Sequence, residues 1–375
     1  MRFVFFYHSL ISDWNHGNAH FLRGVANELQ SRGHEVRVFE PADGWSLQNL
    51  TREYGPAPIK EFSKRFPALK TNFYSIARFD LDEALDGADL VIVHEWNDHE
   101  LVRRLGDHRL KSKYRLLFHD THHRGITDPQ GIANYALDNF DGVLAFGEVI
   151  RELYVRKGWA RRAWTWHEAA DTAVFQPLLE ATHTGDVVWI GNWGDEERTA
   201  ELSEYFIRPV QALGLRANVY GVRYSQEAKA LLAEAGIRYH GWIPNYRVPE
   251  TFCRHRAAIH IPRRPYTQAL PGIPTIRVFE ALACGVPLVC SKWEDVEGLF
   301  TPGEDFLMAR TPQEMRTHLR SVVYDPELAR RMAQHGLNTI RSRHTCAHRV
   351  DELLEIWKQI SVGANVCTSP SSARA

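Results

Sequence analysis

A loop containing Gly272 and Pro274 leads into a segment with helical spacing, and the whole stretch reads GIPTIRVFEALACGVPLVC. A helix beginning near Thr275 would direct its unpaired peptide N–H groups and the positive end of its dipole at a ligand, which suits a diphosphate. Glu280 follows one to two turns later, where a carboxylate could accept hydrogen bonds from the vicinal hydroxyls of a ribose. A lone glutamate on an amphipathic helix is usually a surface residue, but the surrounding chain favours a nucleotide site here. The candidates from this segment are Gly272, Thr275, Ile276, Arg277 and Glu280.

Arginines near the ends of other predicted strands could add positive charge to such a site. Arg198 follows the loop IGNWGDEE after one strand, and Arg263 and Arg264 follow another that ends at Ile261. A bidentate guanidinium would neutralise charge that builds on a leaving diphosphate, an electrostatic contribution that often dominates catalysis. Each arginine alone could equally form a surface ion pair.

Polar residues also follow a buried strand at Phe118, in the sequence FHDTHHR. His122 and Asp120 are candidate ligand-binding residues, because imidazole and carboxylate groups can hydrogen-bond hydroxyls. His119 and His123 bring the number of possible metal ligands in this short segment to four, but the spacing matches no zinc pattern, so we expect no metal.

Further candidates lie on the amino-terminal side. His16, in the loop DWNHGN before the first predicted helix, is a candidate general base with Asp13 as its partner. Gly17, His94 and Trp96 are expected on the acceptor side, where a tryptophan could stack on a sugar, although tryptophans more often serve packing. For any one of the 19 histidines a structural role remains the commoner explanation.

The elements that must position these residues alternate between strand and helix, as in a doubly wound parallel sheet. In the first half, a helix is expected around Phe21–Leu29, and residues 41–80, rich in proline and aromatic side chains, are expected to be an insertion. The predicted strands are Arg2–Tyr7, His34–Glu40, Asp89–Val93, Tyr114–Phe118 and Gly142–Phe146.

A second series of alternating elements follows the polar stretch at 178–185. Its predicted strands are 186–190, 216–220, 237–239, 257–261 and 287–290, and its predicted helices are 196–213, 275–284, 312–324, 326–342 and 347–360. The sequence therefore predicts an α/β fold with two Rossmann-like domains facing across a cleft. The expected divisions are an acceptor-side domain at 1–177, a donor domain at 178–345, a C-terminal helix at 346–361 and a disordered tail at 362–375.

The composition limits the kinds of binding partner and the cellular compartment that we expect. The net charge is −1, with 45 basic and 46 acidic side chains, so nothing global favours nucleic acid or an anionic membrane. Five cysteines without CxxC spacing favour a reducing compartment. The N-terminus resembles a buried strand more than a signal peptide, and no apolar run reaches the ~20 residues of a membrane helix. We therefore expect a cytoplasmic protein.

These segments resemble the GT-B glycosyltransferases, and among them the CgeB-like (spore-maturation) group related to retaining glycosyltransferase family 4. TIRVFEALACGVPLV is similar to that family's donor-binding helix. HEAADTAVFQP (His167–Pro177) is similar to the motif that links the two domains, although Glu168 and Ala169 replace the usual Asn–Gly. Gly17–Glu40 resembles the first glycine loop, helix and strand, and Tyr239–Phe252 the stretch that passes the nucleobase, with Ile243 in it.

The resemblance implies roles for single residues. Glu280 would grip the donor ribose, and Arg198 would bind the diphosphate. A histidine in the region of His122 contacts the donor sugar in related retaining enzymes, so His122 or Asp120 is expected to hold sugar hydroxyls. In inverting relatives a base, often histidine, occupies the loop of His16 and deprotonates the acceptor hydroxyl, which makes His16 with Asp13 the alternative catalytic pair. Many retaining members carry a Glu-x7-Glu pair whose first glutamate would fall on Gly272 here, which leaves the donor sugar and the stereochemistry open. The resemblance also implies that the C-terminal helix crosses back to the first domain.

The expected activity is transfer of a sugar from a UDP-, GDP- or dTDP-sugar to a hydroxyl on a glycan, lipid, small molecule or modified base. Retention is favoured, and no metal or other cofactor is expected, because a helix terminus and arginines would replace it. A nucleotide-sugar epimerase or hydrolase, which would turn over donor without acceptor, and a non-catalytic nucleotide-sugar-binding protein are the alternatives. A dehydrogenase is disfavoured because the first strand leads into SLISDWNHGN and not into a G-x-G-x-x-G turn.

Overall fold

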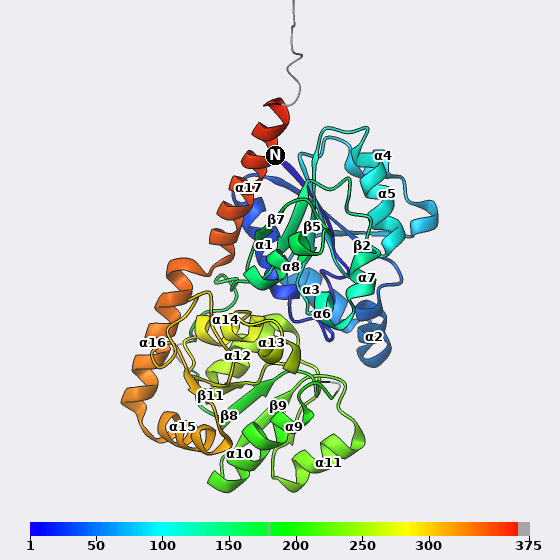
Figure 1. Cartoon of the computed structure of the whole chain (residues 1–375). Helices are drawn as coiled ribbons and strands as arrows, with labels where there is room; N and C mark the ends of the chain where they lie inside the picture. Colours follow the sequence, from blue (N-terminus) through cyan, green and yellow to red (C-terminus); the bar gives the residue numbers. More distant parts are fainter. Residues whose placement is uncertain (179–180, 195, 367–375) are drawn as a thin grey trace, which may run out of the picture.

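Two α/β lobes lie one above the other in the computed structural model, which describes residues 1–178, 181–194 and 196–366 (Figure 1). The first lobe contains a seven-stranded sheet with the order β3-β2-β1-β4-β5-β6-β7, and every strand pair in it is parallel. The apolar runs noted in the sequence form its central strands, because a parallel sheet covered on both faces needs apolar residues on both faces. Its strands are β1 (Arg2–Phe6), β2 (Glu35–Pro41), β3 (Thr71–Tyr74), β4 (Leu90–His94), β5 (Arg115–Asp120), β6 (Gly142–Ala145) and β7 (Ala163–Thr165).

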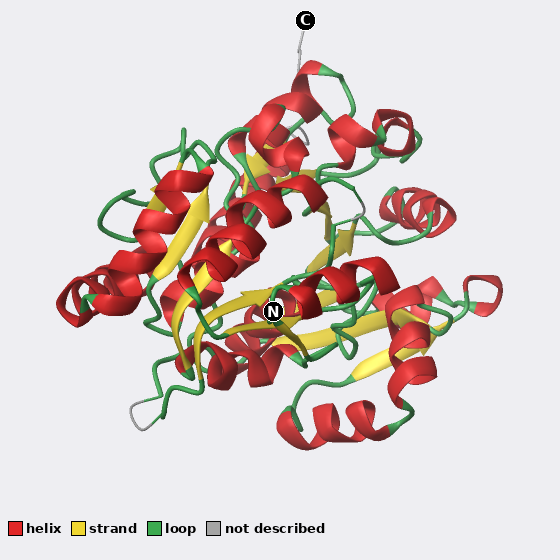
Figure 2. Cartoon of the chain, turned by 90° about the horizontal axis from the view of Figure 1, so that it is seen from below, coloured by secondary structure: helices red, strands yellow, loops and turns green. Residues whose placement is uncertain are grey.

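Helices cover both faces of this sheet, as the view from below shows (Figure 2). The helix predicted from the apolar spacing at 21–29 is present as α1. The helices of this lobe are α1 (Ala19–Ser31), α2 (Trp45–Tyr54), α3 (Ala57–Arg65), α4 (Leu81–Leu85), α5 (His99–Arg109), α6 (Arg124–Thr127), α7 (Pro129–Ala133) and α8 (Glu148–Arg156), with a short 3-10 turn at Ile76–Arg78.

The second lobe repeats the plan with a six-stranded parallel sheet in the order β10-β9-β8-β11-β12-β13. Its strands are β8 (Gly185–Ile190), β9 (Ala217–Tyr220), β10 (Arg238–Tyr239), β11 (His255–His260), β12 (Leu288–Ser291) and β13 (Leu307–Ala309). Its helices are α9 (Thr199–Leu202), α10 (Arg208–Leu213), α11 (Gln226–Glu234), α12 (Val248–Cys253), α13 (Arg264–Gln268), α14 (Ile276–Ala283), α15 (Pro312–Tyr324) and α16 (Pro326–Arg343), with a π-helical turn at Ser203–Ile207 and a 3-10 turn at Asn245–Arg247.

The chain crosses between the lobes twice. The second crossing leads into α17 (Cys346–Val366), which returns to the first lobe and packs against α1, as the resemblance implied (Figure 1). The crossings are bonded to each other: the N–H of Ala170 donates to the carbonyl of His344 at 3.0 Å, and the N–H of Cys346 donates to the carbonyl of Ala170 at 3.0 Å. One apolar core is shared by both lobes at this level, since Phe21, Phe175 and Phe279 belong to the same buried cluster.

Two expectations are corrected. The stretch 41–80 is not only an insertion, because Thr71–Tyr74 pairs with β2 and forms an edge strand of the sheet. The last helix does not end at residue 360 but continues to Val366, while 367–375, the rest of the expected disordered tail, lies outside the described residues. Within the described ranges, no helix is long and apolar enough to cross a bilayer.

Candidate active site

A cavity of about 660 Å³ lies between the two lobes, at the carboxyl ends of both parallel sheets. Ligands of doubly wound folds bind at this edge, because the loops after the strands converge there. Loops after β1, β5, β8 and β9 all contribute to its wall. The predicted residues that line it are Asp13, His16, Gly17, Trp96, His122, Arg198, Ile243, Arg263, Thr275, Ile276 and Arg277.

The start of α14 forms one wall of the cavity. Thr275 occupies the N-cap position in an extended conformation, and its hydroxyl lies 2.9 Å from Nε2 of His260 and makes no bond to the helix. Ile276 and Arg277, in the first turn, both line the cavity. The helix therefore presents its positive end to the space between the lobes, as the sequence predicted.

Arg198 lines the cavity near this helix start and is half-buried. It donates from Nη1 to the carbonyl of Ile261 at 3.2 Å and from Nη2 to the carbonyl of Asn192 at 3.0 Å, and its guanidinium stacks 4.9 Å from the centre of the Trp189 ring. Burial and the neighbouring charge of Arg263 lower its pKa to about 9, so the group is still a cation at neutral pH. Its Nε, which is buried, has no hydrogen-bond partner among the described residues.

Arg263 also lines the cavity, paired with the carboxylate of Glu197 and 3.1 Å from Oδ1 of Asn192. Arg264 instead forms an ion pair with Glu201, with Nε 2.7 Å from Oε1, and is not among the lining residues. Of the two neighbouring arginines, only the first can therefore contact a ligand in this cavity.

The position of Glu280 differs from the expectation that its carboxylate faces the ligand. Its side chain is completely buried, and it does not line the cavity. Its carboxylate accepts hydrogen bonds from Nδ1 of His20 at 2.7 Å, from Nδ2 of Asn245 at 3.4 Å and from the guanidinium of Arg277. The reason is tertiary: His20, in the first turn of α1, meets the Glu280 carboxylate, and the loop just before α1 comes so close to α14 that a Cβ on Gly17 would lie 3.1 Å from Cγ2 of Ile276. In this structure Glu280 holds Arg277 and joins the lobes, and its carboxylate is not exposed to the cavity.

Gly272 does not line the cavity either. It adopts a left-handed backbone with φ of 91°, and its N–H donates to the carbonyl of Glu294 at 2.7 Å. Only glycine adopts this conformation without strain, and a Cβ here would also approach Val296 to 2.7 Å. Gly272 therefore shapes the turn before α14 and is not a lining residue.

His16 does line the opposite wall, but Asp13 does not orient it. The Asp13 carboxylate accepts from Nη1 of Arg23 at 2.9 Å, from Nε1 of Trp242 at 3.0 Å and from the N–H of Asn245 at 2.9 Å. The expected His16–Asp13 catalytic pair is thus corrected: the aspartate links the first lobe to the second.

The nearest ring to His16 is that of His8, with ring centres 3.9 Å apart. Burial, together with the neighbouring His8 and Arg23, keeps the pKa of His16 well below its usual range. The imidazole is therefore neutral at pH 7. Its Nε2 has no hydrogen-bond partner among the described residues, so it is available to a ligand.

His122 lines the cavity from the loop after β5. Burial and the adjacent His123 hold its pKa well below the usual value, and its Nδ1 has no hydrogen-bond partner in the described part of the chain. Asp120 does not line the cavity, which corrects its predicted contact with sugar. Its carboxylate is fully buried and accepts from the N–H of His122 at 3.0 Å and from the Tyr154 hydroxyl at 2.7 Å, so it anchors the loop.

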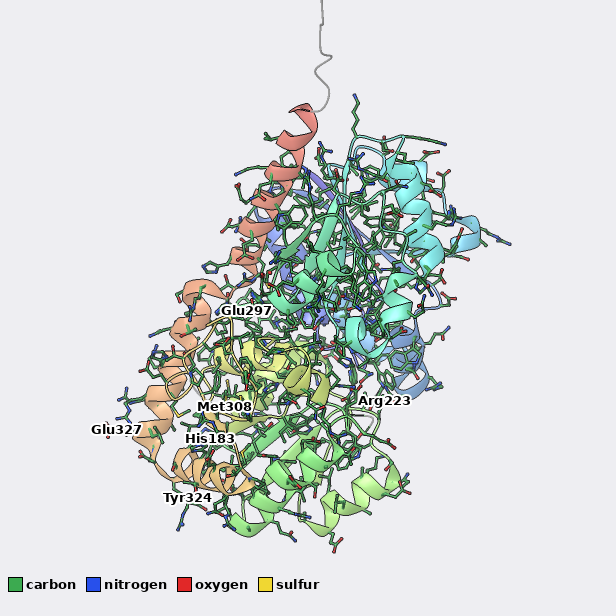
Figure 3. The ribbon with its side chains drawn as sticks, viewed as in Figure 1. His183, Arg223, Glu297, Met308, Tyr324 and Glu327 are labelled. Carbon is green, nitrogen blue, oxygen red and sulfur yellow. The ribbon has the colours of Figure 1, made fainter. Side chains whose placement is uncertain are left out.

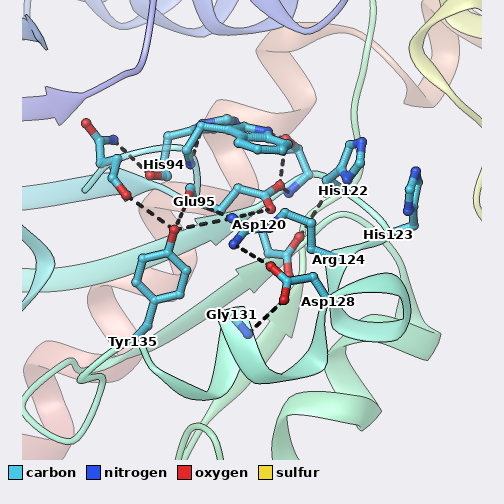
Figure 4. A network of polar contacts seen from close by, with 12 residues as sticks. His94, Glu95, Asp120, His122, His123, Arg124, Asp128, Gly131 and Tyr135 are labelled. Carbon is cyan, nitrogen blue, oxygen red and sulfur yellow. Dashed lines mark hydrogen bonds and ion pairs between the residues drawn. The ribbon is translucent and has the colours of Figure 1, made fainter. Parts of the chain in front are cut away.

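His94 is another correction, since it is fully buried beneath the cavity, with Nε2 3.0 Å from the Thr121 hydroxyl. His119 and Asp120, at the end of β5, are likewise buried, whereas Thr121, His122 and His123 line the cavity. Figure 4 shows Asp120, His122 and His123 in this segment. Across the described residues, no three or more His, Cys, Asp or Glu side chains are arranged to hold a metal ion.

Sequence reasoning missed Glu168 as a site residue. It lines the cavity, and its carboxylate accepts a hydrogen bond from the N–H of Ile276, at the very start of α14. Burial and the nearby charge of Glu280 raise its pKa well above the usual value, although Arg277 opposes them. The one available signal was its departure from the usual linker motif, where a carboxylate replaces an asparagine.

Ile243 lies with Trp242 and Val222 at another side of the cavity, in the loops after β9 and β10, where the resemblance placed the nucleobase. Trp242 also contacts the first lobe, with its ring centre 4.9 Å from that of Tyr54. Arg223 belongs to the same wall, and Figure 3 shows it near the junction of the lobes.

Comparisons with known proteins agree with this architecture. Residues 198–355 match a family described as "Glycosyl transferase-like". Sucrose-phosphate synthase from Thermosynechococcus elongatus is similar in structure, with a TM-score of 0.66 at 12% identity over 97% of this chain and 100% of that one. HepE from Anabaena, solved with UDP and glucose, has a TM-score of 0.67 at 13% identity, covering 96% of this chain and 99% of that one. No curated protein matches the chain.

An α-glucosyltransferase solved with UDP-glucose and DNA containing an abasic site has a TM-score of 0.70 at 11% identity, covering 95% of this chain and 99% of that one. The likenesses confirm the predicted GT-B fold, with two Rossmann-like sheets. The family match covers α10 to α16 entirely and includes Arg198 and α14. The narrower assignment to the CgeB-like group stays a prediction.

Proposed function

We propose that this protein is a glycosyltransferase that takes a nucleotide sugar into the cavity between its lobes and passes the sugar to an acceptor hydroxyl. The observation that carries the proposal is that the start of α14, next to the Glu168 carboxyl group, and two arginines, Arg198 and Arg277, line the same cavity as His16 and His122. A diphosphate at the first turn of α14 would gain from both the helix dipole and the guanidinium groups.

The donor is proposed to be a UDP-sugar. Solved proteins of the same fold are bound to UDP or UDP-glucose, and the cavity is large enough for a ligand of that size. The uracil would lie near Ile243 and Trp242, and the diphosphate would lie between Arg198 and the start of α14. The sugar would then extend toward His122, whose free Nδ1 can hydrogen-bond a hydroxyl.

The proposed reaction breaks the bond between the anomeric carbon and the diphosphate, and forms a bond from that carbon to the acceptor oxygen. Negative charge grows on the leaving diphosphate, where Arg198 and Arg277 stabilise it. For a retaining, metal-independent reaction, a diphosphate oxygen takes the acceptor proton. For an inverting reaction, neutral His16 would take it, because an imidazole without a proton on Nε2 can act as a base.

UDP is expected to raise the unfolding temperature in a thermal-shift assay, and UMP and uridine are expected to raise it progressively less. The reason is that binding to the folded state alone stabilises it by about 2.7 kcal/mol at a ligand concentration of 100 Kd, and each lost phosphate removes contacts with α14 and Arg198. GDP and dTDP serve as base controls. If none of the nucleotides changes the transition, the proposed function is wrong.

Glu168→Gln is expected to bind UDP as wild type does at low pH and more tightly at high pH. Below its raised pKa, Glu168 carries a proton and resembles glutamine. As the pH rises through that pKa, the wild-type side chain becomes an anion next to the diphosphate and weakens binding. Calorimetric titration of both proteins with UDP across the pH range measures the difference. Weaker binding by the variant at every pH would mean that the carboxyl group itself contacts the nucleotide.

A further inference from the structure

A second depression, of about 430 Å³, opens beside the main cavity on the first lobe. It lies among the loop after β4, the start of α5 and the α6–α7 segment. Trp96 and His122 line both spaces, so the depression continues the cavity away from the donor domain. Its lining residues are Trp96, Asn97, His99, His122, Arg124, Thr127, Asp128 and Tyr135.

Trp96 is the dominant surface of this depression. Its side chain is 45% exposed, although it stands next to buried loop residues. The guanidinium of Arg124 lies 4.9 Å from the centre of its ring and covers one face, and the ring of His122 contacts it at 5.2 Å and a steep angle of 73°. Arg124 and His122 thus pack against the tryptophan while much of its apolar surface faces solvent, where a ligand could cover it.

The polar groups around Trp96 carry no unbalanced charge. Arg124 donates to Asp128 Oδ2 at 3.1 Å, to the Tyr135 hydroxyl at 3.3 Å and to the carbonyl of Glu95 at 3.4 Å, as Figure 4 shows for this network. Asp128 also accepts from the N–H of Gly131 at 3.0 Å. The cation is therefore already satisfied by protein groups, and an added phosphate would meet the Asp128 carboxylate instead of a free positive charge.

We propose that this depression binds the acceptor, and that the acceptor is a neutral saccharide. The inference rests on the proposed transferase function and deepens it. A sugar ring has an apolar C–H face that can lie on the exposed surface of Trp96, and hydroxyls that can donate to the half-exposed Asp128 carboxylate. His122 lines both the cavity and the depression. It would hold a hydroxyl of the acceptor at their border, next to the donor sugar. A phosphorylated acceptor or a nucleic acid would find no unpaired positive charge among the residues that line this depression.

Saturation-transfer NMR on the full chain with UDP present tests the proposal. The acceptor samples are methyl α-glucoside, methyl β-galactoside, methyl α-mannoside and N-acetylglucosamine, and the charged samples are glucose 6-phosphate and galactose 6-phosphate. At least one neutral sugar is expected to show saturation, strongest on its C–H protons, and Trp96→Ala is expected to reduce that signal at least fivefold. Trp96→Phe, which keeps an aromatic face, is expected to retain part of it.

Tyr324→Ala is the matched control, because Tyr324 is an aromatic residue 64% exposed at the far end of the second lobe (Figure 3). The Tyr324→Ala variant should leave the saturation signals of UDP and of the neutral sugar unchanged. The UDP protons in the same samples report the donor site independently: if UDP shows no saturation, the proposed function fails. If UDP binds but no neutral sugar does, if the phosphates bind better, or if Trp96→Ala changes nothing, the acceptor assignment is overturned.

Discussion

Arg198→Ala is expected to weaken UDP binding by about 2 to 3 kcal/mol, or roughly 30- to 150-fold, the size of a lost charge-assisted hydrogen bond in a desolvated site. Arg198 already points its guanidinium at the space beside α14, fixed by the carbonyls of Ile261 and Asn192 and by the Trp189 ring. Little side-chain freedom is therefore lost when a diphosphate binds, so most of the interaction energy contributes to affinity.

Calorimetric titration with UDP and with uridine separates the effect from general damage. Affinity for UDP should fall steeply, while the weaker affinity for uridine, which lacks phosphates, should hardly change. Arg198→Lys should lie between wild type and alanine, because a lysine keeps the charge but not the planar, bidentate geometry. Arg331→Ala is the control, since that arginine is 63% exposed in an ion pair on α16. An unchanged UDP affinity in Arg198→Ala would show that the diphosphate binds elsewhere.

Glu280→Ala is expected to lower the free energy of unfolding by about 3 to 5 kcal/mol, the usual cost of removing one partner from a buried ion pair. The variant leaves Nδ1 of His20 and Nδ2 of Asn245 without their shared acceptor and the Arg277 guanidinium without its counter-ion. Urea unfolding followed by tryptophan fluorescence measures the change. Glu280→Gln keeps the shape and one acceptor oxygen, and so should lose less.

The difference in unfolding free energy between wild type and Glu280→Gln is expected to depend on pH. Burial alone would raise the pKa of Glu280, but Arg277 and His20 outweigh it and hold the pKa below its usual 4.5. Its contribution to stability is therefore fully present above about pH 4.5 and is lost as the pH falls through the lowered value. The difference in stability between wild type and Glu280→Gln should shrink under acid. If Glu280→Ala instead keeps its stability and loses only UDP affinity, the ribose contact predicted from the sequence is the correct role.

Local pattern was sufficient for most of the fold. Continuous apolar runs such as Arg2–Tyr7 predicted the central strands, because both faces of a parallel sheet must be buried. The edge strand Thr71–Tyr74 escaped notice, since only Tyr74 in it is buried and a half-exposed edge has no such run. The start of α14 was predicted from its loop and helical spacing, both of which are local.

The placement of single carboxylates could not be predicted in the same way. The sequence around Glu280 indicates a helix but not which lobe packs over it, and α1 approaches from a part of the chain 260 residues earlier. Asp13 was misjudged for the same reason, because its partners Trp242 and Asn245 come from the other lobe. Glu168 was missed because its position at the start of α14 depends on how the linker turns back between the lobes.

The bonded pair of crossings at Ala170 and Thr345 limits how the lobes can separate. Because the two crossings lie side by side, the backbone joins the lobes at one place, and an opening of the cavity would pivot there. Such an opening would break the hydrogen bond that Trp242 Nε1 of the second lobe donates to Asp13 of the first, and closure would form it again.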